Sequence, residues 1–329
     1  MSDANPAFQP PPPPSLPPPA RPRMTKLRIP GIVLIVLGLA CAGLGIAKIL
    51  PGGVGTGLLI GLTGLVFIGL SFVVLPDVPP DQPLSTGEKL AGIFYEPSRV
   101  FRSLRSNPTW VAPILVIGIL NAAYLTAFTQ RLTPERIVNY TVDKMADTPF
   151  IPPEAVEKAR TQGLEDAKAP AQRVNNILKA ICGAFLGVFF ISALYLVALI
   201  AFGGRINYWQ TVSVVAFATL PAAVISKAVS FLLLYLKSPD DIHPIMGQET
   251  LLQDNLGILF TPKDHPVLFV IAASIGILSF YKLWLMAKGL KEGGTKVSST
   301  AAWGVAITLW VIGLLLVVSI TALFPSFIS

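Results

Sequence analysis

The chain of 329 residues is apolar and basic: 53% of its residues are hydrophobic, 13% are charged, and the formal net charge is +7. Together with a mean hydropathy of +0.65, this composition argues against an ordinary soluble domain. Such a charge would suggest nucleic-acid binding in a soluble protein, but here the cations mark membrane topology, so we expect no nucleic-acid partner.

Seven stretches of the chain are long and apolar enough to cross a bilayer, and none of them contains an aspartate or a glutamate. Each holds about 20 mostly apolar residues, which as a helix rising 1.5 Å per residue spans roughly 30 Å of hydrocarbon. The predicted spans are 29–50, 57–75, 109–129, 178–202, 211–236, 266–287 and 303–324. The sequence therefore predicts an all-α integral membrane protein with about seven transmembrane helices.

Residues 1–28 form a low-complexity tail that is rich in proline between Pro10 and Pro22. Such a run favours an extended polyproline II conformation or disorder, either as a spacer or as a ligand for an SH3-like groove. Basic residues lie immediately before the first span, so the positive-inside rule predicts a cytoplasmic N-terminus. After seven spans, the C-terminus is then expected on the extracytoplasmic side. The first apolar run is too long for a cleavable signal peptide and is expected to remain as an anchor.

The next region, 29–76, is predicted to be a glycine-rich hairpin of two spans. Gly57 and Gly61 form a G-x-x-x-G pair in its second span, and small residues at this spacing allow helix backbones to approach closely. Packing within one protein is the usual outcome of such a pattern. Homo-oligomerisation through the same residues is the alternative.

The segment 77–108, here called the elbow, is predicted to contain two short helices on the cytoplasmic side. Ser85 and Glu88 fit a capping box, and a second helix is expected to start at Pro97. Arginines recur every third residue beside aromatic groups, which is typical of a helix lying in the headgroups of an anionic leaflet. A simple topology signal is the alternative. The candidate contacts with lipid or with an unidentified protein partner are Phe94, Glu96, Pro97, Arg99, Phe101, Arg102 and Arg105.

Two polar loops are expected on the opposite side of the membrane. In the longer loop, 130–177, residues 135–145 and 154–168 have helical character. The loop at 237–265 is acidic and contains the only histidines, His243 and His265, whose spacing fits no metal motif. We therefore expect solvated side chains there and no metal site.

The sequence offers little chemistry within the membrane. No hydrolase, zinc-protease, P-loop or dinucleotide-binding motif is found, so no catalytic residue and no cofactor is predicted. Lys227 is the one charge that we expect well inside hydrocarbon, and Pro221 precedes it in the same span. Together they could mark a substrate site of a small-molecule or ion transporter or channel; a proline kink with a snorkelling lysine is the alternative.

Two short segments resemble the bacterial branch of the Yip family, multi-spanning membrane proteins whose eukaryotic members interact with Rab GTPases. They are Ile93-Phe94-Tyr95-Glu96-Pro97-Ser98-Arg99-Val100-Phe101 and Phe217-Ala218-Thr219-Leu220-Pro221. The resemblance implies a five-span domain over 85–325 and a non-enzymatic membrane scaffold or adaptor, acting in membrane organisation or trafficking. It also implies residence in a bacterial inner membrane.

Overall fold

The computed structural model describes residues 23–47, 49–50, 52–74, 84–147 and 151–323, and the proline-rich part of the predicted tail lies outside them. Helices dominate the described residues, and pairing between extended segments is limited to isolated bridges. The helices are α1 (Arg28–Ile46), α2 (Gly53–Leu70), α3 (Thr86–Gly92), α4 (Pro97–Ser106), α5 (Val111–Leu132), α6 (Pro134–Ala146), α7 (Pro153–Lys168), α8 (Pro170–Ala201), α9 (Tyr208–Leu236), α10 (Pro266–Ala273), α11 (Ile277–Gly293) and α12 (Ser299–Leu323).

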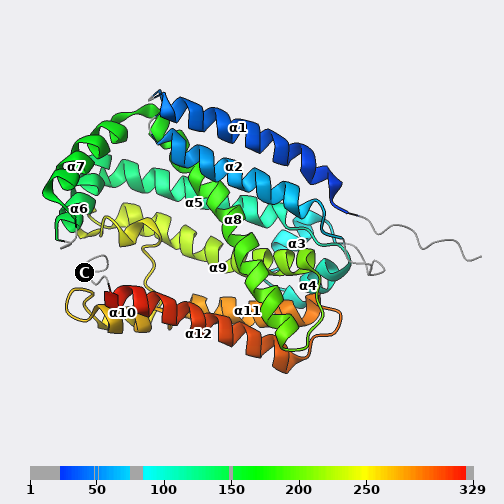
Figure 1. Ribbon diagram of the computed structural model, residues 1–329. Helices are drawn as coiled ribbons and strands as arrows, with labels where there is room; N and C mark the ends of the chain where they lie inside the picture. Colours follow the sequence, from blue (N-terminus) through cyan, green and yellow to red (C-terminus); the bar gives the residue numbers. More distant parts are fainter. Residues whose placement is uncertain (1–22, 48, 51, 75–83, 148–150, 324–329) are drawn as a thin grey trace, which may run out of the picture.

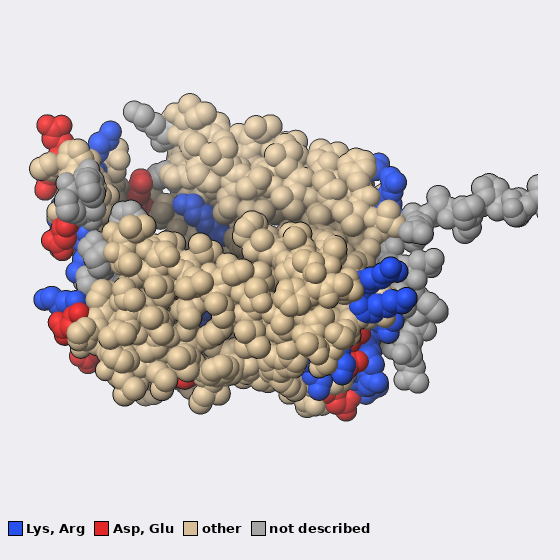
Figure 2. Space-filling view, turned by 60° about the horizontal axis from the view of Figure 1, so that its bottom comes forward, with Lys and Arg blue, Asp and Glu red and all other residues tan. Residues whose placement is uncertain are grey.

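Six of the described helices are long and apolar enough to cross a membrane: α1, α2, α5, α8, α9 and α12. In Figure 1 most of them run roughly along one direction while α8 crosses them at a steep angle, with α3 and α4 at one end of the bundle and α6 and α7 at the other. Figure 2 shows a mostly uncharged surface between two charged ends. The protein is thus an all-α, multi-pass integral membrane protein, as its composition predicts.

The span predicted at 266–287 is not one continuous helix, and this part of the prediction was wrong. The chain forms α10, leaves helical geometry at residues 274–276, and starts again as α11. Segment 254–256 of the preceding loop fills the break. The Asp254 side chain accepts a hydrogen bond from the Leu278 amide at 2.7 Å, and the Leu256 amide donates to the Ile275 carbonyl at 3.1 Å. These bonds satisfy backbone groups that a helix break would otherwise leave unpaired in an apolar region.

Helix α9 is the centre of the molecule. Almost every side chain from Trp209 to Pro221 is buried, and α9 packs against α5, α8 and α11. A helix that is apolar all round has no outward polar face, so it is stable in the middle of a bundle. Pro221 lies inside α9, and the helix continues through it to Leu236.

The N-terminal hairpin joins the remaining helices through aromatic side chains. Phe67 of α2 makes an edge-to-face contact with Trp110, whose centroid is 5.9 Å away, and Trp110 stacks on Trp209 at 5.6 Å. Phe185 and Phe189 of α8 complete the cluster. By contrast, α1 packs mainly against α2, where glycines bring the two backbones together. Gly57 of the predicted pair therefore packs within one chain, whereas a Cβ at Gly61 would meet open space.

Helices α6 and α7 form a polar layer at the end opposite α3 and α4 (Figure 1). They pack on each other, and Arg160 of α7 pairs with Asp143 of α6 at 2.7 Å. The helical character predicted for 135–145 and 154–168 is confirmed. Because each helix starts at a proline, the missing amide falls where a helix leaves amides unpaired anyway.

Candidate functional site

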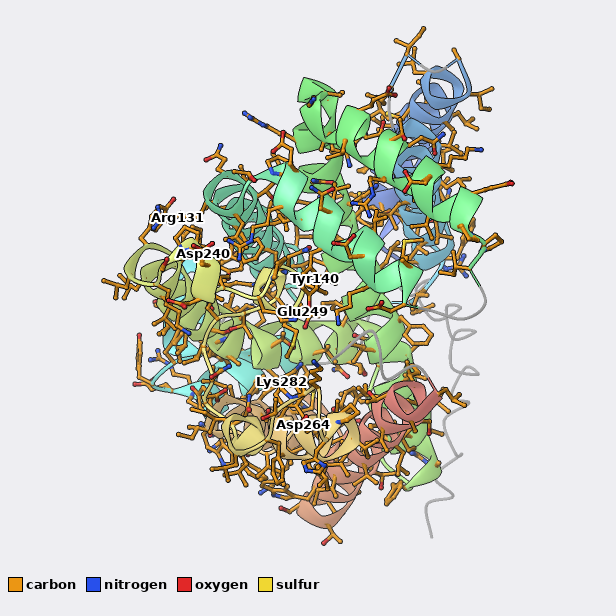
Figure 3. All side chains as sticks on the ribbon, turned by 90° about the vertical axis from the view of Figure 1, so that its left-hand side faces the viewer. Arg131, Tyr140, Asp240, Glu249, Asp264 and Lys282 are labelled. Atoms are coloured by element: carbon orange, nitrogen blue, oxygen red, sulfur yellow. The ribbon has the colours of Figure 1, made fainter. Side chains whose placement is uncertain are left out.

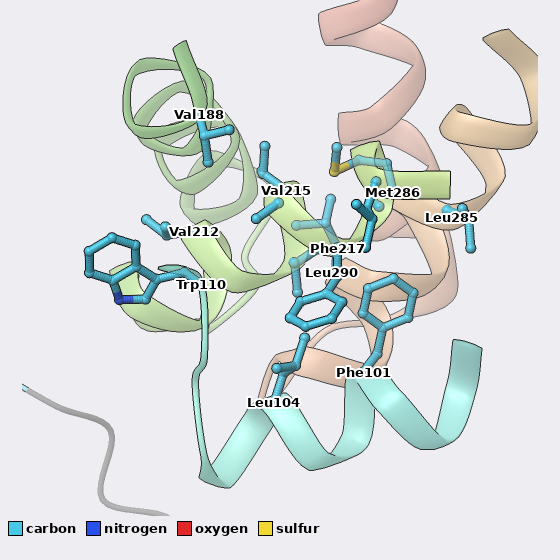
Figure 4. Packing of buried hydrophobic residues seen from close by; sticks show 14 of the residues in the cluster. Phe101, Leu104, Trp110, Val188, Val212, Val215, Phe217, Leu285, Met286 and Leu290 are labelled. Atoms are coloured by element: carbon cyan, nitrogen blue, oxygen red, sulfur yellow. The ribbon is translucent and has the colours of Figure 1, made fainter. Parts of the chain in front are cut away.

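The described part of the elbow, residues 84–108, consists mainly of the two short helices α3 and α4. Ser85 and Glu88 form the predicted capping box of α3, and Pro97 opens α4. Val100, Phe101 and Leu104 share one face of α4, and at most 1% of each residue is exposed. Figure 4 shows Phe101 and Leu104 directed from α4 into the bundle, toward side chains of α9 and α11. The inner face of α4 is thus part of the protein core.

This packing corrects the expectation that Phe101 dips into lipid headgroups. The ring is completely buried and lies against Gly289 of α11, where an added Cβ would come within 2.9 Å of it. Glycine at this position allows α4 and α11 to meet closely. Since no part of Phe101 is accessible, it can contact neither lipid nor a partner, and its role is to fix the elbow to the bundle.

Lys89 provides a second fixing point, which the sequence did not reveal. Its side chain is fully buried and donates to the Asn107 carbonyl at 3.0 Å and to the Thr109 hydroxyl at 3.3 Å. Burial lowers the pKa of Lys89 to about 8. The sequence contains one indication that Lys89 is buried: it lies one helical turn before Ile93, which is also buried.

The outer face of the elbow is basic and aromatic. Phe94 and Tyr95 are 41% and 69% exposed, and Arg99 and Arg102 are exposed on the following helix. Arg99 pairs with the exposed Glu96 at 3.1 Å, and Arg102 donates a hydrogen bond to the Ser98 carbonyl of its own helix. The arginines and Phe101 were predicted to act together at one surface, but they are separated: Arg99 and Arg102 lie on the outside of the elbow, and Phe101 lies in the core.

Arg105 and Pro97 serve the fold more than the outer surface. The Arg105 guanidinium is directed to the Thr295 carbonyl at 3.3 Å, and its own carbonyl accepts a bond from Gln210 at 2.6 Å. Arg105 thus connects α4 to the α11–α12 connection and to α9. Pro97 is half-buried at the first position of α4.

Further cations extend the basic surface around the elbow. The exposed cations at this end of the described chain are Arg23, Lys26, Arg28, Arg99, Arg102, Arg205, Lys291 and Lys296. Arg205 and Lys296 belong to two connections that pair with each other through backbone hydrogen bonds. In Figure 2 blue predominates at the right-hand end, while blue and red are mixed at the left. We call the right-hand end the basic end.

Lys227 is buried between loop 237–265 and Tyr124 of α5. Only 9% of the residue is exposed; its ammonium donates to the Glu249 carbonyl and lies 4.5 Å from the centre of the Tyr124 ring. The Tyr124 hydroxyl donates to the Gly247 carbonyl at 2.7 Å. Loop 237–265 therefore folds back onto the bundle, and Lys227 holds it there. No described contact joins Pro221 to this group.

Hydroxyl groups complete the attachment of the loop. Thr250 Oγ1 lies 3.0 Å from Ser226 Oγ and 2.9 Å from Ser230 Oγ, and the Leu251 amide donates to Ser230. Polar atoms buried at membrane depth are stable only when they are paired, and this network pairs them. The loop was expected to be solvated, but this part of it is packed.

One known protein family matches the part of the chain that contains most of these contacts. The Yip1 domain matches residues 91–320, which is more than two thirds of the chain and runs from the elbow to α12. The chain belongs to the Yip1 family. Comparison with curated proteins and with solved structures gave no match. The Yip1 match leaves out α1 and α2, although the aromatic cluster joins α2 to the matched helices.

The Yip1 family is not known for enzymatic activity. Within the described residues of this Yip1-family protein, no three His, Cys, Asp or Glu side chains gather to hold a metal ion.

His243 is half-buried, which corrects the expectation that the side chains of loop 237–265 are solvated. Its Nε2 lies 2.9 Å from the Tyr140 hydroxyl, and its Nδ1 accepts amide bonds from Ile245 and Met246. Burial, and then the cation of Lys144, lower the pKa of His243, so its neutral form joins α6 to the loop.

Proposed function

We propose that this Yip1-family protein is a non-enzymatic membrane scaffold or adaptor that presents the outer face of the elbow to an acidic protein partner. One observation carries the proposal. The inner face of α4 is buried in the bundle, while Phe94, Tyr95, Arg99 and Arg102 remain exposed on the outside. A rigid surface that combines aromatic rings with arginines is the composition of a protein interface core.

The fixed position of the elbow favours a protein partner over a lipid surface. A membrane-surface helix inserts its apolar face among the lipids, but the apolar face of α4 is already occupied by α9 and α11. On its outer side α4 presents charged side chains, and the exposed rings of Phe94 and Tyr95 lie beside them. Such a surface complements an acidic segment of another protein, and its charges speed the encounter.

The same surface supports a proposed orientation. The basic end carries eight exposed cations, and the positive-inside rule predicts that such an end faces the cytoplasm. The partner would then be a cytoplasmic protein, and the C-terminus would lie on the opposite side. A role in membrane organisation or trafficking, in a bacterial inner membrane, fits this arrangement.

The test uses the full-length protein in native membranes. A photo-crosslinking amino acid replaces Tyr95, whose side chain is outside the core, so that the fold is kept. We expect a specific crosslinked protein, and we expect the variant R99Q/R102Q to lower its yield about tenfold, since removing two cations weakens attraction to an acidic surface. The matched control K158Q/K263Q removes two exposed cations from the other end and should leave the yield unchanged.

Crosslinks only to lipid, with a yield that follows the anionic lipid content, would replace the protein partner with the anionic leaflet. Crosslinks to a second copy of this chain would make the elbow a site of homo-oligomerisation. Equal loss of protein crosslinks in both double variants would contradict the proposal, because the effect would then depend on net charge rather than on this face.

A further inference from the structure

A cavity of about 660 Å³ lies between α8, α9, α10, α11 and α12, within the apolar part of the molecule. Most of its walls are aliphatic, and the aromatic rings of Tyr195 and Trp310 line it as well. Some lining residues also belong to the outer apolar surface, for example Ile191 at 40% exposure and Leu316 at 60%. The cavity therefore opens sideways onto the surface that faces lipid. Its size and lining are those of small-molecule sites, which occur between the helices of bundles.

One charged side chain lines this cavity, that of Lys282. Figure 3 places Lys282 between α9 and the pair α10–α11. The described residues contain three ion pairs, and none of them includes Lys282; no described hydrogen bond uses its ammonium either. The side chain keeps accessible surface, because it faces open space rather than packed atoms.

Taking the basic end as one surface of the membrane places Lys282 deep in the hydrocarbon layer. It precedes Gly293, the last residue of α11, by eleven positions, so it is about 16 Å along the helix axis from the basic end. This is near the middle of a hydrocarbon layer of roughly 30 Å, too deep for the side chain to reach water along the helix. Like Lys227, Lys282 falls inside a predicted span, which for Lys282 is 266–287.

An unpaired ammonium at this depth is costly: insertion scales give about 2.5–3.5 kcal/mol for a lysine at the centre of a span. Lys227 avoids this cost through its bonds to loop 237–265, but Lys282 has no such partner in the described chain. A charge in such a position is stabilised when an anion from outside the chain pairs with it. The anion must arrive through an apolar opening, and this requires a hydrocarbon part on the same molecule.

We infer that this cavity binds an anionic amphiphile, whose carboxylate or phosphate pairs with Lys282 while its hydrocarbon chain lies against α8 and α12. Tyr195, Thr219 and Ser279 bring further polar groups to the same cavity. A fatty acid and an anionic phospholipid share this chemistry. The site is distinct from the elbow and does not depend on the function proposed for it.

Trp310 makes the site directly measurable, because it lines the cavity. The full-length protein is placed in nanodiscs of neutral phosphatidylcholine and titrated with a dibrominated fatty acid, whose bromines quench nearby tryptophan. Dibrominated phosphatidylglycerol and the methyl ester of the brominated acid are titrated in parallel. The quenching assigned to Trp310 is the part that is missing in the variant W310F.

We expect one or both anionic probes to quench Trp310 at low concentration, and the stronger of the two identifies the source of the anion. The neutral ester should bind about tenfold more weakly, as should the anionic probe to K282Q, because each lacks a charge-assisted pair. K282R should keep binding, and K288Q, which removes a lysine outside the cavity, should match the unchanged protein. G313L leaves Lys282 in place but fills the cavity, since nothing lies within 4 Å of a Cβ at Gly313. It should weaken all three probes.

Equal quenching by the acid and the ester, unchanged by K282Q, would overturn the inference, because the cavity would then be an apolar gap filled by any lipid. Quenching that survives G313L would place the probes elsewhere and would also overturn it. So would an absence of quenching in every arm, as expected if a second copy of the chain covers the opening.

Discussion

Replacing Phe101 with alanine should detach the elbow from the bundle without unfolding the spans. Phe101 of α4 is completely buried against α11. Truncating a buried phenylalanine lowers the free energy of unfolding by about 3–5 kcal/mol, through lost transfer energy and the cavity left behind. Helices α3 and α4 are short and lie at one end of the bundle, so the loss should appear first as their local opening. The matched control is Phe94→Ala, because Phe94 is 41% exposed and its truncation should cost about 1 kcal/mol or less.

Amide hydrogen exchange on the full-length protein in nanodiscs measures this opening directly. A loss of 3 kcal/mol corresponds to roughly 100-fold faster exchange in α3 and α4, at a factor of ten for each 1.4 kcal/mol. Exchange in α9 and α12 should stay unchanged. If Phe101→Ala exchanged like Phe94→Ala, α4 would not be held by its inner face, and the rigid outer surface on which the proposed function rests would be lost.

Three further predictions follow from other contacts. The pKa of Lys89 is lowered to about 8, so between pH 8 and about 10.5 the unfolded chain binds a proton that the folded chain does not. Stability should therefore rise with pH in that window, and thermal unfolding of Lys89→Met should lack this rise. Lys227→Met leaves the Glu249 carbonyl unpaired and should destabilise the attachment of loop 237–265 by about 1–3 kcal/mol, measured as faster proteolysis of the loop. The control Lys263→Met, at an exposed lysine, should leave proteolysis unchanged. Labelling of cysteines beside Lys227 by a water-soluble reagent would instead support a transport path. Gly57→Ala should separate α1 from α2, because its Cβ would overlap the α1 backbone, while Gly61→Ala meets open space; equal hydrogen exchange in α1 of both variants would contradict this.

The sequence by itself determined the class of the protein and most of its helices. Long apolar runs without acidic residues have no stable alternative to membrane helices, because backbone groups must be paired where water is absent. The capping box at Ser85 and the helix start at Pro97 were predicted for a similar reason, since caps depend on residues within one turn. The family resemblance, which rested on short segments, is confirmed by the Yip1 match.

Only the tertiary structure decided which face of each element is used. Phe101 and Arg102 are neighbours in sequence, yet one is in the core and the other is outside, because α9 and α11 cover a single side of α4. The three lysines differ in the same way: Lys89 is bonded and buried, Lys227 holds a loop, and Lys282 faces an open cavity. The partners of Lys89 and Lys227 lie about 20 positions away in loops, and the cavity at Lys282 is lined by other helices. Asp254, which bonds at the break between α10 and α11, lies 24 positions before Leu278. Local sequence carries no information about such contacts, because they depend on how the helices pack together.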